Sequence, residues 1–173
     1  MAAACGLMVA IQFGACGATE PRPAAPMTAV QPAGHPRFPI VPMRLVAMDG
    51  ARSAVARANL ELRAEGTLHV AGAPVGRIAG ARILDQDDRE VFAVGPEASA
   101  VTVRRRRRRV RVTDEGALLF DESERVYFDE LGRVVIARPG RPPEWMYLRM
   151  EALRPDALGT GALMVLFSMM RTN

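Results

Sequence analysis

Residues 116–136 read GALLFDESERVYFDELGRVVI, and in this stretch short β-forming runs alternate with acidic or glycine-containing turns. Leu, Val, Tyr and Phe favour extended strands, whereas Asp and Gly favour tight turns. The runs at 117–120, 125–128 and 133–137 are separated by only four residues each. Short strands joined by such short connections predict consecutive antiparallel hairpins.

The same alternation of short β-forming runs and turn residues extends on both sides of this stretch, from Leu60 to Met150. Further strands are predicted at 60–63, 67–70, 74–78, 81–84, 90–94, 100–103, 109–112 and 145–150. About ten strands in the region 45–154 would curl rather than lie in one flat sheet. The predicted fold class is therefore mainly β: an antiparallel meander forming a sandwich or partly closed barrel, with one C-terminal helix.

The region 155–173 carries the strongest helix signal of the chain. Asp156 is predicted to be the N-cap of a helix over Ala157–Met170. Leu163–Met170 reads LMVLFSMM, which is apolar on nearly every face. The preferred interpretation is a helix buried against the open face of the sheet; the alternatives are a membrane-contacting tail and a partner-binding segment. The helix is too short to span a bilayer, which takes about 20 apolar residues.

The amino terminus has the pattern of an export signal. Residues 6–15 are almost entirely apolar, which suits the core of a secretory signal peptide, so residues 1–15 are predicted to be one. Phe13-Gly14-Ala15 precedes Cys16 as in a bacterial lipobox, where the thiol accepts a diacylglyceryl group. Each CH₂ of such an anchor that enters the membrane adds about 0.8 kcal/mol. The alternative is a non-exported protein with an apolar amino terminus.

Residues 16–44 are predicted to be a disordered, proline-rich tether. The prolines are Pro21, Pro23, Pro26, Pro32, Pro36, Pro39 and Pro42. Proline prevents helix and disfavours central strands, so the segment would be an extended spacer that holds the domain clear of a membrane. The alternative is a proline-rich ligand for a recognition domain.

Taken together, the lipobox, the proline-rich spacer, the Gly/Asp-punctuated β-meander and the apolar C-terminal helix resemble uncharacterised outer-membrane lipoproteins of Gram-negative bacteria. The resemblance implies a chain anchored in the outer membrane through a lipid on Cys16, facing the periplasm or the cell surface. Gly17 fits this location, because Asp at that position favours retention in the inner membrane in such proteins. The family has no known activity that the resemblance could assign to this chain.

All 23 basic residues of the chain are arginines, and the formal net charge is +4. Six of the arginines are consecutive: Arg104, Arg105, Arg106, Arg107, Arg108 and Arg109. Because a strand would turn three of them toward the core, a flexible connection is predicted, with pairing resuming near Val110. Guanidinium groups bind phosphate, so the candidate partners are anionic lipid or an anionic envelope polymer. The alternative is a solvated loop with no ligand. Nucleic acid is disfavoured, because the run has no aromatics for stacking.

Other chemistry-bearing residues form no recognisable constellation. The only cysteines are Cys5 and Cys16, which excludes a disulfide-stapled fold and a cysteine-ligated zinc site. His35 and His69 lack metal-ligand spacing, and no serine among Ser53, Ser99, Ser123 and Ser168 sits in a G-x-S-x-G elbow. No metal, cofactor or catalytic residue is predicted.

Two further groups have alternative interpretations. An acidic cluster is formed by Asp121, Glu122, Glu124, Asp129 and Glu130, and acidic turn chemistry is preferred to weak calcium binding. Trp145 and Tyr147 share one face of a strand, where core packing is preferred to stacking on a sugar.

The predicted function is a non-enzymatic, lipid-anchored structural or binding module of the envelope. Two alternatives remain. One is an envelope hydrolase that uses carboxylates such as Asp129 with Glu122. The other is an intracellular protein that binds nucleic acid through the arginine run.

Overall fold

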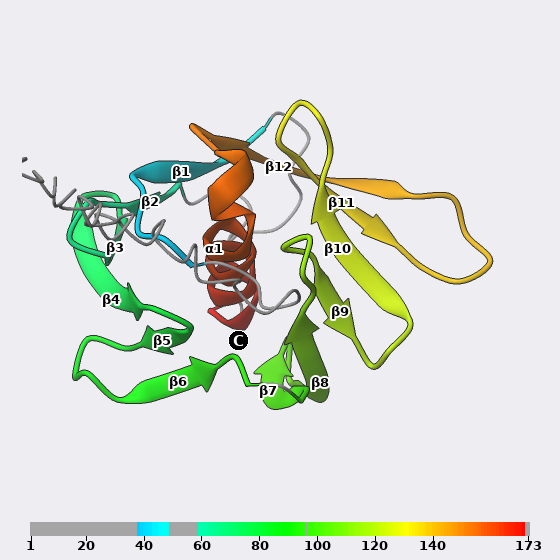
Figure 1. Ribbon diagram of the computed structural model, residues 1–173, viewed down its shortest axis with the longest axis horizontal. Helices are drawn as coiled ribbons and strands as arrows, with labels where there is room; N and C mark the ends of the chain where they lie inside the picture. Colours follow the sequence, from blue (N-terminus) through cyan, green and yellow to red (C-terminus); the bar gives the residue numbers. More distant parts are fainter. Residues whose placement is uncertain (1–37, 49–58, 96, 172–173) are drawn as a thin grey trace, which may run out of the picture. The chain divides into compact units, whose positions relative to one another are not determined.

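In the computed structural model, residues 38–48, 59–95 and 97–171 are described, and they all belong to the unit Pro32–Asn173. They form twelve strands, a short 3₁₀ turn and one α-helix (Figure 1). The strands are β1 Met43–Ala47, β2 Leu60–Leu62, β3 Thr67–Val70, β4 Ala73–Ala79, β5 Arg82–Leu84, β6 Glu90–Ala93, β7 Ser99–Val103, β8 Arg106–Val112, β9 Leu118–Phe120, β10 Glu124–Phe128, β11 Arg133–Ala137 and β12 Glu144–Glu151. The 3₁₀ turn η1 is Pro155–Ala157, and the helix α1 is Leu158–Met170.

The strands form a single antiparallel sheet in the order β6-β5-β4-β3-β2-β1-β12-β11-β10-β9-β8-β7. Successive strands pair with each other along each half, and β1 joins the two halves by pairing with β12. The edge strands β6 and β7 are consecutive in the chain. The Ser99 hydroxyl on β7 donates a hydrogen bond to the carbonyl of Ala93 on β6, 2.7 Å away. The predicted mainly β meander is confirmed, and the sheet is nearly closed into a barrel.

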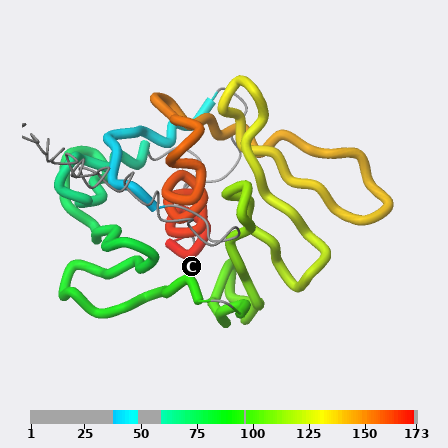
Figure 2. Tube along the Cα trace, in the orientation of Figure 1, coloured from blue at the N-terminus to red at the C-terminus, as the bar shows by residue number. Residues whose placement is uncertain are grey.

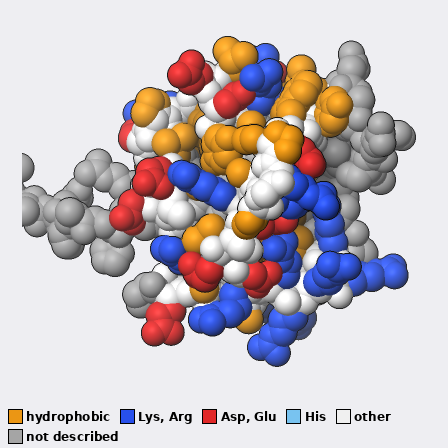
Figure 3. Space-filling model, turned by 90° about the vertical axis from the view of Figure 1, so that its right-hand side faces the viewer, with side chains coloured by type: hydrophobic (Ala, Val, Ile, Leu, Met, Phe, Trp, Pro, Cys, Tyr) orange, Lys and Arg blue, Asp and Glu red, His pale blue; other side chains and the backbone are white. Residues whose placement is uncertain are grey.

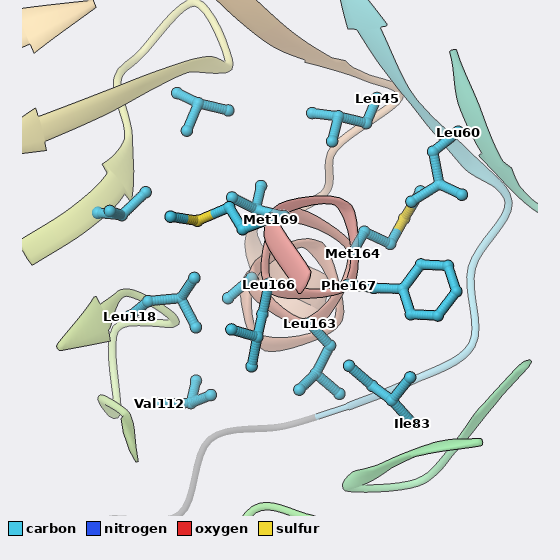
Figure 4. Packing of buried hydrophobic residues seen from close by; sticks show 14 of the residues in the cluster. Leu45, Leu60, Ile83, Val112, Leu118, Leu163, Met164, Leu166, Phe167 and Met169 are labelled. Atoms are coloured by element: carbon cyan, nitrogen blue, oxygen red, sulfur yellow. The ribbon is translucent and has the colours of Figure 1, made fainter. Parts of the chain in front are cut away.

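The helix α1 occupies the middle of this curved sheet (Figures 1 and 2). Its residues from Gly159 to Met169 are all buried. A helix that is apolar all round needs apolar partners on every side, and a nearly closed sheet supplies them. Side chains from β1, β2, β5, β8 and β9 surround it, as Leu45, Leu60, Ile83, Val112 and Leu118 show in Figure 4. Of the three interpretations of the C-terminal segment, burial against the sheet is therefore correct.

The start of the helix differs from the prediction. Asp156 lies within η1, and its carboxylate binds the Arg154 guanidinium instead of capping the helix. The N-cap position belongs to Ala157, which makes no side-chain cap hydrogen bond. Pro155 explains the shift, because a proline favours the first position of a helical turn. No helix among the described residues is long and apolar enough to cross a membrane.

The folded domain begins earlier than the predicted boundary at residue 45. Strand β1 starts at Met43, and Phe38, Ile40 and Val41 pack against the core. The hydroxyl of Thr160 on α1 donates a hydrogen bond to the carbonyl of Pro39, 2.8 Å away. The last residues of the predicted tether, 38–44, are therefore part of the domain. The rest of the tether and the predicted signal peptide, with Cys16, lie outside the described residues.

Candidate functional site: an arginine hairpin

The six-arginine run forms a β-hairpin, and the prediction of a flexible connection is wrong. Strand β7 pairs with β8 from Ser99↔Val110 to Val103↔Arg106. Arg104 and Arg105 make the two-residue turn between them, with φ of 49° and 62°. Two positive φ values are the signature of a type I′ turn, whose twist matches that of the strands it joins. Four of the six arginines therefore belong to a regular strand.

The hairpin tolerates arginines on both faces because it extends past the core. Val101 and Val103 on β7 are buried, and so are Val110 and Val112 on β8. By strand alternation Arg106 and Arg108 share this inner face. Strand β9, however, pairs with β8 only at Val110–Val112, so the arginine half of β8 reaches beyond β9. Only Arg108 is close enough to the core to be largely covered.

Arg108 is held by two carboxylates and an aromatic ring. Its Nε donates to Asp121 Oδ2 and its Nη1 to Glu124 Oε1, both at 2.7 Å. Its guanidinium lies 4.7 Å from the centre of the Phe120 ring. Glu124 in turn accepts a hydrogen bond from Arg138 Nε at 2.8 Å. The side chains of Arg108 and Glu124 are only 21% and 15% exposed, so this network attaches the root of the hairpin to β9, β10 and the end of β11.

The network also determines the charge states of its acids. Burial opposes ionisation of Glu124, but hydrogen bonds from Arg108 and Arg138 outweigh it and hold the pKa of Glu124 below its usual value. The hydrogen bond from Arg108 also lowers the pKa of Asp121. Both carboxylates therefore remain ionised at neutral pH and neutralise Arg108, which leaves it unable to recruit a further anion.

The other arginines of the run are exposed. The side chains of Arg104, Arg106, Arg107 and Arg109 make no ion pair with any residue in the described part of the chain. In Figure 3 arginine side chains gather along the lower edge of one face. Each guanidinium offers several donors in a planar fork that matches a carboxylate or a phosphate group. This arginine hairpin, Ser99–Val112, is the candidate site.

The acidic cluster is divided between the two ends of β10. Asp121, Glu122 and Glu124 lie at its start, whereas Asp129 and Glu130 follow its end. The Asp129 carboxylate accepts hydrogen bonds from the backbone N–H groups of Leu131 and Arg133, and Glu122 pairs with Arg111. Hydrogen bonds within a turn therefore account for Asp129, and an ion pair with a neighbouring strand accounts for Glu122. Asp129 and Glu122 do not converge, and no group of three or more metal-ligating side chains exists in the described ranges.

The histidine and serine candidates have structural partners. His69 Nε2 lies 3.0 Å from the Thr67 hydroxyl, and its Nδ1 lies 3.1 Å from the carbonyl of Gly72. Ser99 bridges β6 and β7, and Ser168 is buried in α1. His35 and Ser53 lie outside the described residues.

Trp145 and Tyr147 lie on the outside of the sheet, so the prediction of core packing is wrong. Their rings stack with centroids 4.8 Å apart and an interplanar angle of 28°. Tyr147 is 41% exposed. The Arg133 guanidinium lies 5.7 Å from the centre of the Trp145 ring, and Arg125 lies 5.5 Å from that of Tyr127. Sequence reasoning missed Tyr127 and Arg133, although their alternation with the buried Val126 and Val134 marks them as outward-facing.

A scan against protein-family models finds no match, and searches of curated proteins and of solved structures find no similar protein. The assignment of the site therefore rests on the geometry and charge of the hairpin alone.

Proposed function

We propose that this protein is a non-enzymatic binding module of the bacterial envelope, which binds anionic groups through the arginine hairpin. The observation that carries the proposal is the set of exposed guanidinium groups at Arg104, Arg106, Arg107 and Arg109, which have no ion-pair partner in the described part of the chain. In most of the described domain arginines are matched by nearby acids, as Arg77 is by Asp88 and Arg138 by Glu124. The hairpin instead presents a local excess of positive charge.

The backbone of the hairpin supports a binding role. An ordered strand holds its arginines in place before a ligand arrives, so binding loses less conformational entropy than it would for a flexible loop. Arg104 and Arg105 both have left-handed backbone conformations, which cost about 1 kcal/mol each for residues other than glycine. Asn-Gly would form the same turn with less strain.

A lipid anchor on Cys16 would place the hairpin at the envelope surface. The support is the lipobox pattern of residues 13–16 and the proline-rich segment that follows it. A tethered domain is confined near anionic groups of the same surface, which raises their effective concentration and makes weak individual contacts sufficient. The resulting assignment is a lipoprotein of the outer membrane that contacts anionic lipid or envelope polymer.

The hairpin can be tested by a variant that preserves its turn. Arg104→Asn with Arg105→Gly removes two charges and supplies the preferred type I′ pair, so the melting temperature of the domain should stay the same or rise. Binding to inorganic polyphosphate, measured by calorimetry at low salt, should weaken about thirtyfold, because each of the two basic residues contributes about 1 kcal/mol near an anionic surface.

The matched control removes two exposed arginines from the other half of the sheet that also make no ion pair in the described domain, Arg44→Thr on β1 with Arg82→Thr on β5. This variant should bind polyphosphate as the parent does. Equal losses in both double variants would show that only net charge matters and would overturn the proposal, as would a parent protein without measurable affinity.

The anchor predicts a separate result. Cys16→Ala should move the protein, expressed in a Gram-negative host, from the membrane fraction to the soluble fraction. Mass spectrometry of the parent should find an acylated amino terminus at Cys16, whereas Cys5→Ala should change neither result. A parent chain that retains Met1 and carries no acyl group would refute the anchor while leaving the hairpin proposal intact.

A further inference from the structure

The outer face of the sheet from β8 to β12 is one continuous wall. Hydrogen-bonded registers place Arg111 beside Leu119, and Leu119 beside Arg125. Two residues further along β10, on the same face, Tyr127 lies beside Val135, and Val135 lies beside Trp145. Adjacent strands are about 4.8 Å apart and residues along a strand about 3.3 Å apart, so Arg109, four strands across and four residues along from the row of Trp145, is roughly 23 Å from the aromatics of β12 along this wall.

An irregularity in β12 brings the aromatic end of the wall to the surface. The register with β11 shifts between Arg133↔Arg149 and Val135↔Trp145, so β12 carries extra residues there. Tyr147 lies in this bulge with a φ of 57°, and its carbonyl accepts a hydrogen bond from the backbone of Met48 at 2.9 Å. For a bulky residue this backbone conformation is a genuine outlier. Its effect is to lay the Tyr147 ring against Trp145 with 41% of the residue exposed.

Arginines lie on the same wall as the exposed ring, one on β12 itself and two at the β8 edge. Arg149 is the cross-strand neighbour of Arg133, and its exposed side chain makes no ion pair with a residue of the described domain. At its β8 edge the wall ends in Arg107 and Arg109. Their side chains likewise make no ion pair with a residue of the described domain. In Figure 3 hydrophobic side chains lie among acidic and basic ones in the upper part of the face whose lower edge carries arginines. The wall therefore combines a stacking platform with anion-binding groups on either side of it.

We infer that this wall binds an acidic polysaccharide, with one sugar ring stacked on Tyr147 and the acidic substituents paired with Arg107, Arg109 and Arg149. This inference rests on the proposed function and names its ligand class. A sugar ring has an apolar C–H face that packs on an aromatic ring, and its carboxylate or phosphate groups match the flanking guanidiniums.

The number of available rings favours a sugar over a single-stranded nucleic acid. Proteins bind single strands by stacking successive bases on successive aromatic rings. On this wall the Trp145 ring is already stacked by Tyr147 and flanked by Arg133, and Tyr127 is half-buried. Tyr147 therefore provides one exposed stacking position. Anionic lipid headgroups would use the arginines without needing this ring at all.

Trp145 is the only tryptophan in the chain, so its fluorescence reports occupancy of the wall directly. The full chain carrying Cys16→Ala, which removes the proposed lipid anchor so that vesicles can bind only through the folded domain, is titrated with polygalacturonate, and with dextran, poly(dT) and phosphatidylglycerol vesicles as comparison probes. Polygalacturonate should change Trp145 emission saturably and bind more tightly than the other three probes. Equal affinity for uncharged dextran, or tighter binding of poly(dT) or of vesicles, would overturn the inference.

Tyr147→Gly removes the ring at a backbone position that suits glycine, so the fold should be retained. Tyr147→Asn provides a second variant that also tolerates this conformation. Both should weaken polygalacturonate binding about fivefold, the scale of one aromatic contact. Val91→Ala, which trims an apolar residue of similar exposure on β6, should have no effect.

The outcomes separate the two proposals. If Arg104→Asn/Arg105→Gly weakens binding of polyphosphate but both Tyr147 variants bind polygalacturonate like the parent, the polysaccharide inference fails and the anion-binding function stands. If the parent binds neither polyanion, the anion-binding function itself fails.

Discussion

Replacing Leu166 by alanine is expected to lower the free energy of unfolding by about 3 kcal/mol and the melting temperature by about 10 °C. Leu166 is fully buried on the helix at the centre of the sheet, where neighbours on all sides prevent the cavity from collapsing. Urea denaturation followed by circular dichroism measures the loss.

The control for this substitution is Leu131→Ala. Leu131 is 63% exposed in the turn between β10 and β11, so its truncation should change stability by less than about 0.5 kcal/mol. If Leu166→Ala were as mild as Leu131→Ala, α1 would not be the core of the domain in solution, and a partner- or membrane-contacting role for the helix would have to be reconsidered.

Gly116→Ala is expected to destabilise the domain by about 3 kcal/mol, because the turn between β8 and β9 packs directly on the start of α1. A Cβ at Gly116 would lie 2.5 Å from Leu158 Cβ and 2.8 Å from the Gly159 nitrogen. These are contacts that neither backbone can relieve without moving the helix. The φ of +73° adds the strain of a left-handed conformation.

Gly72→Ala is the matched control for Gly116→Ala. Gly72 also has a positive φ, of 82°, but nothing lies within 4 Å of an added Cβ. This substitution should therefore cost only the conformational strain, about 1 kcal/mol. Thermal denaturation of the two variants side by side separates strain from packing. Equal losses would show that the contact between the turn and the helix contributes little.

The central helix also limits where the domain could bind a ligand. Side chains such as Leu163, Met164 and Leu166 fill the interior that a barrel of this size could otherwise offer to a ligand. The outer surface of the described domain, which includes the wall and the protruding hairpin, then remains for contacts with other molecules. This agrees with a site built from exposed arginines and an exposed aromatic ring, which needs a rigid support more than an internal cavity.

The local sequence pattern is sufficient to predict much of the fold. Alternating apolar residues and Gly/Asp turns identified nearly all the strands, and the apolar C-terminal segment identified a helix that needs partners on every face. A hairpin is specified within some ten residues, so its signal is contained in the sequence around it. Strand β1 was missed because proline-rich sequence precedes it and its partner β12 lies about a hundred residues away.

Only the tertiary structure decided which residues are available for binding. The arginine run looked incompatible with a strand, because alternation would bury half of it; the end of β9 lets the hairpin extend past the core instead. Trp145 and Tyr147 looked like core residues because aromatics usually are, yet the register of β12 with β11 turns them outward. Periodicity along a strand shows which residues share a face. Which face meets solvent, and where the core ends, depend on contacts between segments distant in the chain.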